Sequence, residues 1–93
     1  YCGVGAIGMG LLPRSREVRF NEAAGEGLRG LEMGLAAMPL RVRAKARVVG
    51  GDAARADSLL EGADTVIVDT PRKGLASTLL VAIAAAQPRR LLY

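Results

Sequence analysis

The chain has 93 residues, 51% of them hydrophobic, and its 13 basic and 9 acidic residues give a net charge of +4. This length allows one domain, and the apolar content is too high for a disordered segment. A single cysteine excludes an internal disulfide framework, and the absence of histidine excludes a Ser-His-Asp or Cys-His hydrolase and leaves no recognisable zinc or other metal site. No apolar run is long enough to span a membrane, and no signal peptide opens the chain, so we expect a soluble, cytoplasmic protein.

The first third of the chain predicts a glycine-rich turn, a short strand and a helix. Four glycines within the first ten residues favour a turn and a brief helix that ends at Pro13. Residues 18–20 are typical of a short buried strand that leads to Asn21 and Glu22. Apolar residues three and four apart predict an amphipathic helix over residues 23–38, whose glycines either weaken it or mark a face packed closely against the sheet.

The middle of the chain predicts a strand with one basic face. Residues 40–49 alternate strictly between apolar and basic side chains, a pattern that suits an edge strand. That face is either solvated or in contact with RNA. A turn at residues 50–52 and one or two helical turns within residues 56–61 follow. The basic residues of the alternating segment are Arg41, Arg43, Lys45 and Arg47.

The last third predicts a buried strand, a helix and a further strand. Residues 65–68 form a β-branched run without a polar break, as in a central strand that is buried on both faces. Ser77 or Thr78 is placed to cap a helix that runs through Ala86, and residues 90–93 begin another strand. Alternating strands and helices predict an α/β fold with a mostly parallel sheet and flanking helices.

The distinctive side chains fall after the predicted strands, where ligands of parallel sheets collect. Residues 3–8 form a G-x-G-x-x-G sequence, whose backbone can pass close to a cofactor. Glu22 lies 19 residues after Gly3, close to the spacing expected for an acid that binds ribose hydroxyls. Asp52 either accepts a hydrogen bond from an adenine amino group or stabilises the Gly50-Gly51 turn through local hydrogen bonds.

Residues 69–74 form the most unusual string, D-T-P-R-K-G, which places an acid, a proline turn and two cations at the mouth of the sheet. Cys2 lies beside the glycine loop, and we expect it to serve packing, because no histidine is present to lower the pKa of its thiol.

Two motifs together resemble one family. Residues 1–5, Y-C-G-V-G, and residues 69–75, D-T-P-R-K-G-L, are similar to the Y-C-G-x-G and D-P-P-R-x-G motifs of the S-adenosylmethionine-dependent RNA (uracil-5-)methyltransferases. The resemblance runs over essentially the whole chain but covers only part of the family's catalytic domain. It implies that residues 1–93 are a Rossmann-like class I methyltransferase core truncated at both ends. Thr70 stands where the family has a further proline, directly after the acid, which loosens the turn but keeps Asp69 and Arg72.

The resemblance also implies a cofactor, S-adenosylmethionine, and an RNA substrate, either tRNA or rRNA, with no membrane and no obligate protein partner. In the family a cysteine thiolate adds to carbon 6 of uracil, carbon 5 takes the methyl group, and a carboxylate base removes the proton. The family's nucleophile and base follow beyond the equivalent of Tyr93, so we expect no catalytic residue in this chain, only the active-site neighbours Asp69 and Arg72. The implied roles are cofactor binding by Tyr1, Gly3, Gly5, Ala6, Glu22, Asp52 and Asp69, and RNA binding by Arg72 and Lys73.

Two other functions fit part of the pattern. A nucleotide-binding oxidoreductase of the Rossmann type, using NAD(P), would equally suit the glycine sequence and Glu22, but it leaves residues 69–74 unexplained. A non-catalytic RNA-binding relative would use the basic face together with Arg72 and Lys73.

Overall fold

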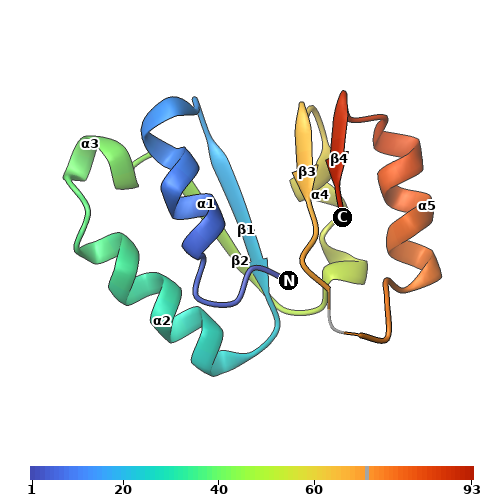
Figure 1. Ribbon diagram of the computed structural model, residues 1–93, viewed down its shortest axis with the longest axis horizontal. Coiled ribbons are helices and arrows are strands. Elements are labelled where there is room, and N and C mark those ends of the chain that lie inside the picture. The colour runs from blue at the N-terminus through green and yellow to red at the C-terminus, as the bar shows by residue number, and fades with distance from the viewer. Residues whose placement is uncertain (71) are drawn as a thin grey trace.

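The computed structural model describes residues 1–70 and 72–93, which form a compact α/β fold of short parallel strands with flanking helices (Figure 1). The strands are β1 (Val18–Glu22), β2 (Ala46–Gly50), β3 (Thr65–Ile67) and β4 (Arg90–Leu92). The α-helices are α1 (Ala6–Leu11), α2 (Gly25–Ala36), α3 (Leu40–Arg43), α4 (Asp57–Leu60) and α5 (Ser77–Ala86), and the 3-10 helices are η1 (Leu12–Arg14) and η2 (Ala53–Arg55).

The strands form two parallel pairs within the described residues, β1 with β2 and β3 with β4. This confirms the expected α/β fold with parallel strands, but the single sheet that the sequence predicts is divided in two. Beside β1, the backbone N–H groups of Tyr1 and Cys2 donate to the carbonyl oxygen of Asn21 at 2.8 and 3.0 Å. No ladder of strand hydrogen bonds joins the two pairs among the described residues.

Each strand pair has its own hydrophobic core. The first core lies between β1, η1 and α2, and its large side chains are 0–8% exposed. The second lies between η2, the end of β3 and α5. The first core consists of Leu12, Phe20, Leu31 and Leu35, and the second of Ala53, Val68, Leu79 and Ile83.

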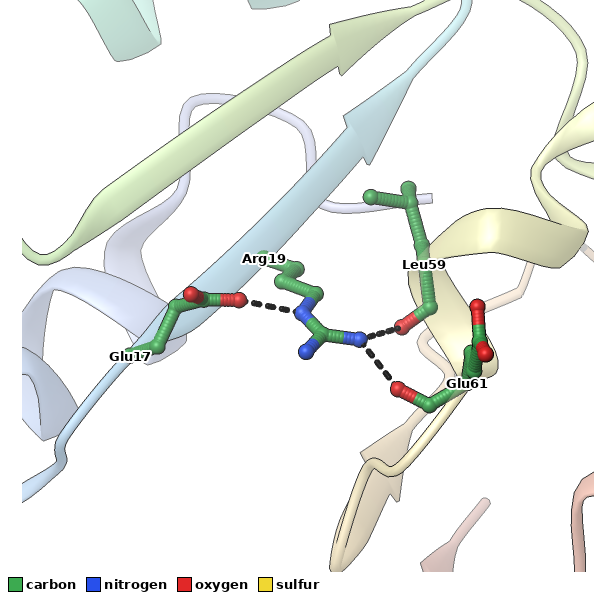
Figure 2. Close-up of polar contacts among 4 residues, drawn as sticks. All are labelled: Glu17, Arg19, Leu59 and Glu61. Carbon is green, nitrogen blue, oxygen red and sulfur yellow. Dashed lines mark hydrogen bonds and ion pairs between the residues drawn. The ribbon is translucent and has the colours of Figure 1, made fainter.

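Arg19 connects the two halves of the molecule (Figure 2). Its guanidinium pairs with Glu17 on one side and donates from Nη1 to the carbonyl oxygens of Leu59 and Glu61, at 3.1 and 2.6 Å, on the other. Because Leu59 and Glu61 belong to the α4 turn, one side chain of β1 holds that turn against the first strand pair.

The glycines of α2 do mark a closely packed face, and its partners are the glycine loop and α1 as well as the end of β1. A Cβ atom on Gly30 would lie 2.7 Å from Val4 Cγ1, and one on Gly34 would lie 2.8 Å from Met9 Cε. Helix α2 therefore approaches the N-terminal segment more closely than alanine would allow.

The predicted strand over residues 40–49 is wrong in its first half. Residues 40–43 form the helical turn α3, because the carbonyl of Pro39 accepts hydrogen bonds from the N–H groups of Val42 and Arg43. Strand β2 begins only at Ala46. The four basic residues therefore do not share one strand face, since Arg41 and Arg43 belong to the helical turn.

Two further expectations need correction in the second half. Strand β3 is not buried on both faces, since it pairs with β4 alone among the described strands and leaves Ile67 38% exposed. Neither Ser77 nor Thr78 caps α5: the N-cap is Ala76, and Ser77 is the first helical residue. In the part of the chain that the structure describes, no helix is long and apolar enough to cross a membrane.

Candidate functional site

The glycine loop, the end of β1 and the turn after β2 converge at one edge of the first strand pair. Strand β1 ends at Glu22, which pairs in register with Gly50 at the end of β2. The N–H of Gly51 donates to the carbonyl oxygen of Glu22 at 2.9 Å. In Figure 1 the chain start lies near this lower end of β1.

The Glu22 carboxylate is fixed by backbone N–H groups. Oε2 accepts from Gly3 at 2.6 Å, and Oε1 accepts from Ala23 and Ala24 at 2.9 Å each. The N–H of Ala24, with those of Gly3 and Ala23, holds the pKa of Glu22 below its ordinary range, against an opposing effect of burial. A carboxylate offers about four acceptor positions. These three bonds therefore leave one position, on Oε2, for a ligand hydroxyl.

Gly27 allows this arrangement. A Cβ atom at this position of α2 would lie 2.9 Å from Glu22 Cγ and 3.3 Å from the carbonyl oxygen of Gly3. Contacts this short require a neighbour to move. A glycine at position 27 therefore lets the first turn of α2 lie close to both the glycine loop and Glu22.

Asn21 ties three segments of the site together, and sequence reasoning assigned it no role. Its Nδ2 donates to the carbonyl oxygens of Val49 and Gly51 at 3.1 Å each, which fixes the turn after β2. Its backbone carbonyl oxygen accepts hydrogen bonds from the N–H groups of Tyr1 and Cys2. Within the described residues, its buried Oδ1 atom has no hydrogen-bond partner.

A cavity of about 270 Å³ opens at this junction. Ligand cavities generally measure about 300–1,000 Å³, so this one suits part of a nucleoside-sized ligand. Its walls include an aromatic ring, an amide and a carboxylate among small side chains. The lining residues are Tyr1, Asn21, Ala23, Asp52 and Ala53.

The cavity lies where the two halves of the molecule meet, because its lining residue Tyr1 contacts both of them. The Tyr1 side chain packs against the second core, while its amino group is bonded to β1. Asp52 caps the 3-10 helix η2, where Oδ1 accepts from the Ala54 N–H at 2.9 Å. The sequence offered stabilisation of the Gly50-Gly51 turn as one of two roles for Asp52, whereas the observed bond caps the helix that follows. The residue remains exposed beside the cavity.

Gly5 and Ala6 do not line the cavity. Gly5 is buried with φ +78°, and a Cβ there would collide with the Leu31 side chain, so this glycine serves a turn and close packing. Ala6 begins α1 and is exposed.

Cys2 lies against the first core, and burial raises the pKa of its thiol. The raised pKa disfavours the thiolate at neutral pH, which fits the expected packing role and offers no nucleophile.

The second motif follows β3, in the other half of the molecule. Asp69, Arg72 and Lys73 are exposed and follow β3, and none of them lines the cavity. Pro71, which the sequence marks as the centre of a rigid turn, lies outside the described residues. Of the expected cofactor residues, Tyr1 and Asp52 line the cavity, whereas Gly3 and Glu22 are bonded to each other beside its lining residue Ala23. The residues expected near the methyl group and RNA are not among the lining residues.

The chain is similar to two proteins that are named RNA methyltransferases. The chain is 28% identical over 93 residues to a protein of Protochlamydia amoebophila named an uncharacterized RNA methyltransferase, of which it covers 24%. It is 31% identical over 98 aligned residues to a protein of the same description from Halalkalibacterium halodurans, of which it covers 20%. The chain thus spans about a quarter or a fifth of the length of these curated relatives. No family model and no solved structure matches it.

Proposed function

We propose that this chain is the S-adenosylmethionine-binding part of a Rossmann-like, class I RNA methyltransferase that acts in the cytoplasm. The alignment of the full chain with proteins named RNA methyltransferases supports an RNA methyltransferase relationship. The finer proposal, that the whole protein methylates carbon 5 of a uridine in tRNA or rRNA, is supported by the paired motifs at residues 1–5 and 69–75.

The observation that carries the cofactor proposal is the convergence of the glycine loop on Glu22. Gly3 donates to a carboxylate that also receives two N–H groups from the start of α2. This geometry holds the carboxylate ionised, with one acceptor position remaining for a ribose hydroxyl. The hydrogen bonds to Glu22 therefore support its proposed role in cofactor binding, in addition to its spacing from Gly3 in the sequence.

The residues around the cavity fit the nucleoside half of the cofactor. Tyr1 offers an aromatic face, and Asp52 offers an exposed carboxylate whose Oδ1 already caps η2. Aromatic rings stack favourably on nucleobases, and carboxylates accept from amino groups. In the proposed arrangement Glu22 holds the ribose, Asp52 and Tyr1 border the adenine, and Gly3 allows close approach of the backbone.

When bound, S-adenosylmethionine supplies an electrophilic methyl group. Asp69, Arg72 and Lys73 follow β3 at the same carboxyl ends of the strands that parallel folds use for ligands. In the proposal Asp69 lies near the methionine end of the cofactor, and the two cations attract the phosphates of RNA. In this proposal Gly5 and Ala6 do not contact the cofactor; they set the conformation of the glycine loop.

Equilibrium dialysis of labelled S-adenosylmethionine against the chain, with NADH as competitor, tests the cofactor. We expect binding that NADH does not displace and that Glu22→Ala weakens roughly tenfold, or about 1.4 kcal/mol. Glu26→Ala is the matched control, because Glu26 is exposed in the first turn of α2 and takes part in no hydrogen bond among the described residues.

The outcome of the dialysis distinguishes a methyltransferase from the two alternative functions. Displacement by NADH would favour a dinucleotide-binding oxidoreductase. The absence of binding by a chain shown to be folded would contradict the cofactor proposal and leave an RNA-binding relative without methyl transfer. Equal weakening by the Glu22 and Glu26 variants would contradict the assigned role of Glu22.

A further inference from the structure

The positive charge of the molecule is concentrated in two segments. Residues 12–19 and 39–47 contain seven cations and one acid, a net charge of +6, whereas all other residues together carry −2. The modest overall charge therefore conceals a strongly basic region on an otherwise weakly acidic chain.

The fold joins these segments at the amino end of the first strand pair. Helix α3 packs against η1, and the N–H of Val18 donates to the carbonyl of Lys45 at 3.0 Å. In Figure 1, α3 and the beginning of β1 lie at the upper end, whereas the chain start lies near the lower end of β1. We call this region the basic end, and it consists of Arg14, Arg16, Arg41, Arg43, Lys45 and Arg47.

Two of these cations have a structural role. Lys45 Nζ donates to the carbonyl oxygens of Leu12 and Pro13 at 3.4 Å each, and Arg43 Nη1 donates to that of Ala36 at 3.2 Å. Cations at the carbonyl ends of helices stabilise them. The positive charges of Lys45 and Arg43 are therefore explained by their contribution to the stability of the fold.

The other four cations are exposed and take part in no hydrogen bond or ion pair among the described residues. Like charges gathered at one end of a molecule repel one another, so the clustering of Arg14, Arg16 and Arg41 does not serve the stability of the fold. The nearby acid, Glu17, is already paired with Arg19. The unpaired cations are Arg14, Arg16, Arg41 and Arg47.

We propose that the basic end binds the phosphate backbone of RNA. The inference rests on the RNA substrate of the proposed function, and it places a second contact far from Arg72 and Lys73. Strand β1 has five residues, so its two ends are about 16 Å apart. The surface is mainly arginine, whose planar fork matches phosphate oxygens. An RNA held here would be anchored at the end of the sheet opposite the cofactor.

The test compares two triple variants with the same net charge. Arg14→Gln/Arg16→Gln/Arg41→Gln neutralises the basic end, and Arg29→Gln/Arg55→Gln/Arg89→Gln neutralises three exposed arginines elsewhere. Fluorescence anisotropy follows binding of each chain to a labelled oligouridylate longer than the ~4–16 nucleotides of single-strand sites. The titrations run over a series of salt concentrations without S-adenosylmethionine, and circular dichroism confirms that the variants are folded.

We expect the basic-end variant to bind about tenfold more weakly or worse, with a salt-dependence slope lower by about 2, as loss of three phosphate contacts predicts. The control variant should change little. Equal weakening of both variants, no RNA binding by the unmodified chain, or tighter binding to phosphatidylserine vesicles than to RNA would overturn the inference. Because no cofactor is present, RNA binding through the basic end without cofactor binding would leave this inference standing and contradict only the methyltransferase proposal.

Discussion

The two strand pairs of the molecule are packed to different degrees. The core under β1 and β2 contains Leu12, Phe20 and Leu31, which are 0–2% exposed, and Leu35, which is 8% exposed. The core under β3 contains smaller side chains at 4–8% exposure. Large apolar residues remain exposed on both halves, among them Met33 and Leu40 on the first and Val81, Leu92 and Tyr93 on the second.

This difference explains where the candidate site is built. Glu22 and Asn21 extend from the well-packed first pair, so their side chains are held by a stable strand, whereas Asp69 follows the short, half-exposed β3. A rigid base is what a preorganised binding site requires. The first half therefore supplies the geometry, and the second half contributes one wall through Ala53 and the ring of Tyr1.

Matched leucine truncations give the largest expected contrast. Leu31→Ala should cost about 4–5 kcal/mol, because the side chain is fully buried between α2 and β1, and Leu79→Ala about 2–3 kcal/mol. Urea unfolding followed by circular dichroism measures both. Equal losses would contradict the unequal packing of the two cores.

The link between the halves is tested at Arg19. Arg19→Met removes the donors to Leu59 and Glu61 and should cost about 1–2 kcal/mol, since hydrogen bonds from charged groups are strong but this side chain is 26% exposed. Hydrogen exchange of the α4 amides should accelerate. Glu17→Gln is the control, and it should change stability little because the carboxylate is exposed. A larger effect of Glu17→Gln would show that Arg19 does not act as the link.

Gly27→Ala is expected to destabilise the site more than the whole fold. Overpacking against Glu22 and Gly3 costs about 1–3 kcal/mol and exceeds the helix-propensity gain of about 1 kcal/mol. Gly25→Ala, two residues earlier, meets only an arginine tip at 3.9 Å and should be neutral or slightly stabilising. Thermal unfolding and cofactor dialysis of both variants separate the two effects. Equal behaviour would exclude the close approach of α2 to Glu22.

The smallest expected effect is a pH dependence at Glu22. Because its pKa is lowered in the folded state, the unfolded chain binds more protons and stability rises with pH. The contribution is present above the unfolded value of about 4.3 and is lost as pH falls through the lower folded value. Urea titrations at several acidic pH values should therefore show a shallower acid loss in Glu22→Gln. Identical acid profiles would contradict the backbone bonds to this carboxylate.

Local patterns were sufficient to predict most elements. The three- and four-residue spacing of apolar positions correctly predicts the helix now observed as Gly25–Ala36, and the glycines at 50–51 mark the turn that follows β2. Glu22 and Asp52 were located at strand ends by position alone, because parallel strands bring their carboxyl ends to one edge.

Other features depend on contacts that the sequence does not reveal. The alternation over residues 40–49 is compatible with a strand, but the carbonyl of Pro39 starts a helical turn there. Asn21 carries no motif, since its partners are carbonyls 28 and 30 residues away. The division into two strand pairs likewise arises from tertiary placement and not from the pattern of any one segment.

The most direct test of the central claim is a titration of the isotope-labelled chain with S-adenosylmethionine, followed by NMR amide shifts. We expect the largest shifts to cluster around the cavity and the amides of β4 and α5 to change little. No shift, or shifts confined to the second strand pair, would contradict the assignment of the cofactor to this edge. The amides expected to move are those of Gly3, Ala23, Ala24, Gly51 and Ala54.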